Sequence, residues 1–136
     1  MSASARRYVA LGSAIALVIV AVVAGLMVLG SPAEERLRRL DEKRLQDQQE
    51  ISRATNGYWV RNGRLPASLD DLLQEPSVHV QSHDPDTGQT YGYRVVGDNS
   101  YELCADFQHQ SVEESVNRFW SHDVGRHCFQ LEAKRR

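Results

Sequence analysis

The two cysteines of this 136-residue chain, Cys104 and Cys128, are the residues whose spacing most directly suggests a chemistry. Neither lies in a Cys-x-x-Cys pair or has the spacing of a zinc-ligand set. A structural disulfide is the simplest use, since it would close a loop of about 25 residues and stabilise a small domain by about 3 kcal/mol in an oxidising compartment. The alternative is a pair of separate buried thiols, because free cysteine is a common core residue.

Histidines offer two arrangements that could hold a metal. His79 and His83 are four residues apart, but they lie in a stretch that we expect to be extended, where this spacing does not place both rings on one face. The second arrangement is a cluster near the C-terminus, made of His122, Asp123 and His127. Both patterns are weak as zinc sites, so we predict no bound metal.

Asp84 and Asp86 are the calcium candidates, because Asp84-x-Asp86-x-Gly88 begins like a calcium-binding loop. The later acidic ligand of an EF-hand is missing from this segment. Asp-Pro-Asp-Thr-Gly is also a sound turn sequence without any ion. We therefore predict a turn at residues 84–88 and no cofactor.

No sequence pattern indicates catalysis or nucleic-acid binding. Ser111, Ser115 and Ser121 lack a nucleophile-elbow motif and a glycine-rich loop, so we expect that the protein is not an enzyme. The formal net charge is −2 and no face is persistently basic, which argues against nucleic acid as a partner. Phe119 and Trp120 precede the last predicted strand. They either close the core as a flap or form an exposed partner-binding contact.

Alternation of apolar and polar residues predicts three strands that would position the cysteines. These strands cover residues 90–96, 101–107 and 126–131. Their apolar faces carry Tyr91, Tyr93, Val95, Tyr101, Leu103, Ala105, Phe107, Phe129 and Leu131. Each cysteine lies on the opposite face of its own strand. Adjacent antiparallel strands would present Cys104 and Cys128 on the same outer side, which favours the disulfide.

Two helices are expected within residues 31–75, before the strands. Residues 32–55 carry opposite charges at four-residue spacing, which is typical of a solvated helix. The sparse apolar stripe of this helix is interrupted at Arg44 and Asp47, and we expect packing on a globular head to begin only near Ile51. A short second helix is predicted to start at Ser68, as its N-cap, and to direct three leucines inward.

Residues 8–30 form an uncharged run of twenty-three residues. As a helix this run would be about 34 Å long, enough to cross a hydrocarbon core of about 30 Å. A cleavable secretory signal is the alternative, because Arg6 and Arg7 form a basic start and residues 31–33 include small residues suited to cleavage. The apolar part of such signals spans about 7 to 15 residues, so we predict a retained transmembrane anchor.

Two observations predict opposite orientations for this anchor. Two arginines precede the span, whereas five basic residues follow within fifteen positions of its end, so the positive-inside count places the C-terminal domain in the cytoplasm. A disulfide between Cys104 and Cys128 requires the opposite placement, since disulfides persist in oxidising compartments.

The order of these parts resembles the pseudopilins of type II secretion systems and their type IV pilin relatives. The segments that carry the resemblance are NGRLPASLDDLL at 62–73, DPDTGQTYGYRV at 84–95 and YELCADF at 101–107. The resemblance implies a pilin-like head displayed outside the cytoplasmic membrane, a late cysteine paired with one in the second strand, and other pilin-like or secretion-system membrane proteins as partners. The chain departs from the family because its apolar helix lacks the Gly-Phe cleavage site and the glutamate four residues later.

Together these patterns predict an α+β fold, in which an N-terminal transmembrane helix continues into a long helix packed on a small antiparallel three-stranded sheet. The chain is divided into a cytoplasmic tail at 1–7, a transmembrane helix at 8–30, a helical stalk at 31–55 and a pilin-like head at 56–136. The expected location is the bacterial inner membrane, with the C-terminal domain outside the cytoplasm. The expected role is a non-catalytic structural or accessory component of a secretion or pilus-like apparatus. The alternative is a stand-alone membrane-anchored periplasmic module for binding or sensing.

Overall fold

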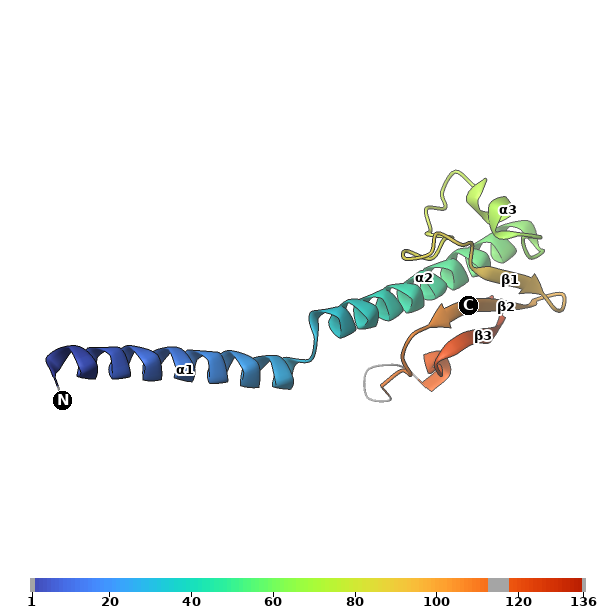
Figure 1. Ribbon diagram of the computed structural model, residues 1–136. Coiled ribbons are helices and arrows are strands. Elements are labelled where there is room, and N and C mark those ends of the chain that lie inside the picture. Colours follow the sequence, from blue (N-terminus) through green and yellow to red (C-terminus); the bar gives the residue numbers. More distant parts are fainter. Residues whose placement is uncertain (1, 113–117, 136) are drawn as a thin grey trace. The chain divides into compact units, whose positions relative to one another are not determined.

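The computed structural model describes residues 2–112 and 118–135, in two compact units, Met1–Arg36 and Leu37–Arg136 (Figure 1). The first unit contains helix α1, Ala3–Leu29, in which no residue is buried. An 18-residue window of this N-terminal region has a mean hydropathy of 2.7, so the helix is long and apolar enough to cross a membrane. A signal sequence passes the same test, and the retained anchor stays a prediction.

Helix α2, Pro32–Asn62, follows α1 with only two residues between them. The first of these, Gly30, has a φ of +77°, a conformation that glycine adopts without steric cost. The hydroxyl of Ser31 accepts a hydrogen bond from the Glu34 N–H at 3.2 Å and so caps the new helix. Pro32 is its first residue, where the missing N–H of proline costs no helical hydrogen bond.

The second unit is built around one face of α2. The buried residues of the helix are Asp41, Arg44, Asp47, Gln48, Ile51, Thr55 and Tyr58. The expectation that packing begins near Ile51 is wrong, because Asp41 and Arg44 are already 6% and 1% exposed. Charged side chains can occupy this buried face because they form ion pairs and hydrogen bonds with segments later in the chain.

Helix α3, Leu69–Leu73, is the predicted short helix. The Ser68 hydroxyl accepts a hydrogen bond from the Asp71 N–H at 3.1 Å, which confirms the predicted N-cap. Leu69 and Leu72 are buried, whereas Leu73 is half-buried. The helix therefore directs its apolar side into the core, as its sequence predicts.

In the described residues, three antiparallel strands form a sheet of order β1-β2-β3 (Figure 1). They cover Gly92–Val95 in β1, Ser100–Phe107 in β2 and Gly125–Glu132 in β3. A short 3₁₀ helix, η1, spans Arg118–Trp120. The α+β fold, with a long helix against a three-stranded antiparallel sheet, is confirmed.

The core lies between α2, α3 and the inner face of the sheet. From the sheet it takes Tyr101, Leu103, Ala105, Phe107 and Phe129, which confirms the predicted faces of β2 and β3. Val95 was predicted on the same face but is 42% exposed. It is the last residue of the edge strand β1, and the turn residues that follow it are exposed.

Candidate functional site

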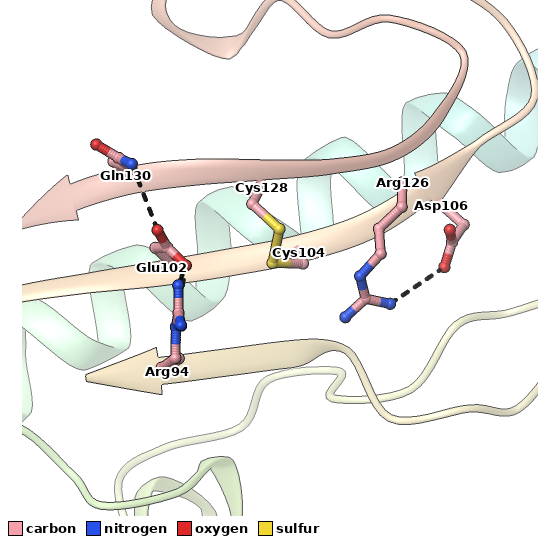
Figure 2. Close-up of a disulfide and its surroundings, with 7 residues drawn as sticks. All are labelled: Arg94, Glu102, Cys104, Asp106, Arg126, Cys128 and Gln130. Atoms are coloured by element: carbon pink, nitrogen blue, oxygen red, sulfur yellow. Dashed lines mark hydrogen bonds and ion pairs between the residues drawn. A yellow bond between two sulfur atoms is a disulfide. The ribbon is translucent and has the colours of Figure 1, made fainter. Parts of the chain in front are cut away.

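Cys104 and Cys128 form a disulfide across the outer face of the sheet (Figure 2). The two residues are directly opposite each other in the register of β2 and β3, with Cα atoms 4.0 Å apart and an S–S distance of 2.01 Å. The alternative of two separate thiols is therefore excluded in this structure. Cys128 is exposed, so solvent reaches one side of the bond.

Two polar rows flank the disulfide on this face (Figure 2). In one row, Arg94 on β1 forms an ion pair with Glu102 on β2 at 2.6 Å, and Gln130 on β3 donates to the same carboxylate at 3.4 Å. In the other row, Arg126 on β3 lies 3.7 Å from Asp106 on β2. The outer face thus carries the disulfide between charged side chains of all three strands.

Gly92 on β1 lies beside the disulfide, opposite Cys104 in the register. A Cβ atom at this position would lie 2.9 Å from the Cys104 Cβ and 2.9 Å from the Arg126 Nη2. Both distances are far inside ordinary contact. The absence of a side chain at Gly92 therefore allows the disulfide and Arg126 to occupy this part of the face.

A buried ion-pair network lies on the other side of the sheet, centred on Arg44 of α2. The guanidinium donates to both carboxylate oxygens of Asp84, from Nε at 2.5 Å and from Nη2 at 3.1 Å, and to Asp41 from Nη1 at 2.9 Å. The hydrogen bond with Asp84 raises the pKa of Arg44 above its ordinary value, although burial opposes the charge. Arg44 is thus a buried, permanently charged link between α2 and the turn before β1.

Asp41 extends this network to the end of β2. Its carboxylate accepts hydrogen bonds from the backbone N–H groups of Gln108 and His109, at 3.0 and 2.8 Å. The Nδ1 atom of His109 lies 3.1 Å from the same carboxylate. One buried aspartate therefore fixes the chain where it leaves the sheet.

Asp47 forms the third buried carboxylate of this face. It accepts a hydrogen bond from the Tyr91 hydroxyl at 2.8 Å and forms an ion pair with Lys43 at 2.6 Å. Burial and the hydrogen bond to Asp47 raise the pKa of Tyr91, so its hydroxyl remains a donor. The contact holds the start of the sheet against α2.

Asp84, which the sequence suggests as a calcium ligand, stabilises the turn and forms the ion pair with Arg44. Its carboxylate accepts the N–H groups of Asp86 and Thr87, both at 2.9 Å, in addition to the bonds from Arg44. Burial opposes ionisation of Asp84, but the hydrogen bonds from Arg44 and the two backbone groups outweigh it and lower its pKa to about 2. The predicted turn is present, and Arg44 is the cation that faces Asp84.

The histidine candidates do not form a metal centre in the described part of the chain, where no group of three His, Cys, Asp or Glu side chains could hold an ion. His79 and His83 are exposed. His122 instead stacks on Phe107 with ring centroids 3.6 Å apart, and burial lowers its pKa. His127 packs against Phe129 at 4.7 Å. The C-terminal histidines are therefore packing residues here.

Phe119 and Trp120, the two residues with alternative roles, differ in burial. Trp120 is partly buried and packs against Phe129 with ring centroids 4.9 Å apart, so it closes the core. Phe119 is 49% exposed and meets Trp120 edge-on. Of the serines considered for catalysis, Ser115 lies outside the described residues, and the Ser111 hydroxyl accepts the His122 N–H at 2.9 Å.

A groove of about 360 Å³ opens where α2 meets the chain that follows β2. His109 and His122 line it together with the apolar side chains of Leu45, Val112 and Val124. The remaining lining residues are polar or charged, so the groove presents charged, polar and apolar groups together: Arg38, Asp41, Glu42, Gln108, Gln110 and Ser111.

Sequence reasoning missed the buried role of Asp41, Arg44 and Asp47. A signal was present, because these residues follow one another at three-residue steps and continue the helical face of Ile51.

A scan against protein-family models finds no match for this chain, and comparisons with curated proteins and with solved structures find none either.

Proposed function

We propose that this chain is a single-pass bacterial membrane protein whose pilin-like domain lies outside the cytoplasmic membrane and serves as a non-catalytic structural or accessory part of a secretion or pilus-like apparatus. The observation that carries the proposal is the order of elements. An apolar helix of 27 residues precedes a charged helix that packs on a three-stranded antiparallel sheet, and a disulfide joins the second and third strands. The sequence resemblance to pseudopilins implies this same layout.

The disulfide supports the extracytoplasmic side of the proposal. Cross-strand disulfides such as Cys104–Cys128 form and persist in oxidising compartments, of which the bacterial periplasm is one. The positive-charge count around α1 favours the reverse orientation. We give the disulfide more weight, because the basic residues after α1 are interleaved with acidic ones within a single helix.

Thiol alkylation tests this placement directly. Intact cells that express the full chain are treated with a thiol reagent, with and without prior reduction, and the protein is then denatured and weighed by mass spectrometry. The proposal predicts labelling of Cys104 and Cys128 only after reduction, on a chain that retains residues 1–30. Freely reactive cysteines in untreated cells would contradict it, and loss of the apolar segment would show that α1 is a cleaved signal.

A stand-alone binding or sensing module is the second candidate. The groove beside His109 and His122 favours it, and so does the lack of an acidic residue within α1 that could dock a neighbouring pilin subunit. Crosslinking in native membranes separates the two functions. Adducts with pilin-like or secretion-system membrane proteins support the apparatus, whereas their absence favours the module.

A further inference from the structure

In the part of the chain that the structure describes, the backbone groups on the outer edge of β3 have no hydrogen-bond partner. β3 neighbours only β2 in the sheet, and among the described residues no group forms a hydrogen bond with its other edge. The N–H of Ala133, just after β3, donates to the Asn99 carbonyl at 2.7 Å. Every second residue of β3, counted back from Ala133, therefore directs its backbone groups to β2. The residues between them point their backbone groups outward: Arg126, Cys128, Gln130 and Glu132.

This edge has few of the features that prevent pairing with another strand. Proteins protect strand edges with very short strands, bulges, proline or charged side chains, most often lysine. β3 is eight residues long and contains neither proline nor lysine. Its sequence, GRHCFQLE, therefore leaves the edge open to a further strand in the described structure.

Charges along the edge match a second copy of the same strand. When two identical strands pair in antiparallel fashion, a two-fold axis relates them. Their outward backbone groups face each other only when this axis lies at the position of a residue and not between two residues. An axis through Phe129 places Arg126 opposite Glu132 of the second copy, and the same pair recurs on the other side of the axis. This register matches opposite charges twice.

The neighbouring registers lack this match. An axis through Gln130 would place Arg126 opposite Lys134, where like charges repel. An axis through Cys128 would place Arg126 opposite the neutral Gln130. The distribution of charge therefore selects the register centred on Phe129.

The charged residues of the edge are available for such a contact. Arg126 is 61% exposed and lies 3.7 Å from Asp106, and Glu132 is 59% exposed and lies 3.5 Å from Lys134. Exposed pairs of this kind hold side chains only weakly, so both residues can turn toward a partner strand. The half-exposed Phe119 lines a cavity with Glu132 and adds apolar surface beside the edge.

We propose that this edge binds a second copy of the chain: β3 pairs with β3 of that copy, antiparallel and centred on Phe129, so that the two sheets form one continuous sheet. Arg126 of each copy then faces Glu132 of the other. The proposal is independent of the secretion or pilus-like role, because it rests only on the edge and its charges.

Charge reversal in the full chain tests this pairing. The dissociation constant of the dimer is measured by analytical ultracentrifugation in detergent micelles at low salt, where surface charges are least screened. Arg126→Glu and Glu132→Arg each place like charges opposite one another twice, so each should weaken association about tenfold. The double variant exchanges the two charges and should return to within about threefold of the wild type.

Arg94→Glu is the matched control, because it reverses an exposed arginine on the same sheet face but on β1, away from the edge. We expect it to leave the dimer unchanged. Near-ultraviolet circular dichroism and an intact disulfide establish that each variant is folded. A monomeric wild type overturns the proposal, and so does a dimer that tolerates both single reversals, since α1 or another face would then be the contact. Failure of the double variant to recover overturns the proposed register.

Discussion

The guanidinium of Arg44 donates hydrogen bonds to both carboxylate oxygens of Asp84, at 2.5 and 3.1 Å, although the two residues are 40 positions apart in the sequence. The pair joins the middle of α2 to the turn before β1. Asp41 shares the same guanidinium and also binds the backbone at the end of β2. A single buried cation therefore holds together three segments that meet only in the folded protein.

Loss of Arg44 should strongly destabilise the head. Arg44→Ala leaves the carboxylates of Asp41 and Asp84 buried without their cation, and removing one partner of a buried pair costs about 3–5 kcal/mol. The free energy of unfolding is measured by denaturant titration of the full chain, followed by tryptophan fluorescence. Arg94→Ala, which breaks an exposed ion pair, should cost less than about 1 kcal/mol. Equal losses in the two variants would show that Arg44 has no special role.

Acid should weaken the same link through Asp84. The pKa of Asp84 is lowered from 3.8 to about 2 in the folded protein. Its ionised form therefore stabilises the fold fully above pH 3.8, and this contribution is lost as the pH falls to about 2. The total is about 2 kcal/mol, since one pKa unit corresponds to about 1.4 kcal/mol. Denaturation midpoints measured across this range should fall with acid, and in Asp84→Asn, which is less stable throughout, that part of the decline should disappear.

The disulfide should stabilise the sheet. Cys104 and Cys128 are separated by 24 positions, and a crosslink of this span lowers the entropy of the unfolded chain. Replacement of both by alanine should reduce the free energy of unfolding by about 3 kcal/mol. Reduction of the wild type should have a similar effect, which separates the crosslink from the packing of the side chains. If neither treatment shifts the denaturation midpoint, the bond has no role in stability.

A methyl group at Gly92 should be poorly tolerated. In Gly92→Ala the new carbon would meet the Cys104 Cβ at 2.9 Å, and this atom is held by the disulfide and the backbone of β2. Overpacking of this kind costs about 1–3 kcal/mol. Gly97→Ala is the control, because its nearest contact would be 3.4 Å from the Ser100 Cβ. Thermal unfolding of both variants measures the difference, and matching midpoints would contradict the steric argument.

Several features follow from local patterns in the sequence. The alternation in β2 and β3 places Tyr101 and Phe129 inward and both cysteines outward, because successive side chains of a strand point to opposite faces. The Ser68 cap is similarly local, since the hydroxyl and the N–H that it binds are three residues apart. Neighbouring residues contain all the information that these predictions need.

The roles of Arg44 and Asp47 depend on tertiary structure. From the helix sequence alone, each would be expected to be solvated. Burial of a charged side chain is tolerated only when a partner from elsewhere in the chain compensates for the loss of water. Asp84 supplies that partner 40 positions away and Tyr91 supplies it 44 positions away. Likewise, the adjacent positions of Phe119 and Trp120 do not show which of the two is buried. Only the fold shows that Trp120 packs on Phe129 while Phe119 remains half exposed. Periodicity therefore determines the elements and their faces, whereas the long-range contacts decide which charged residues the core accepts.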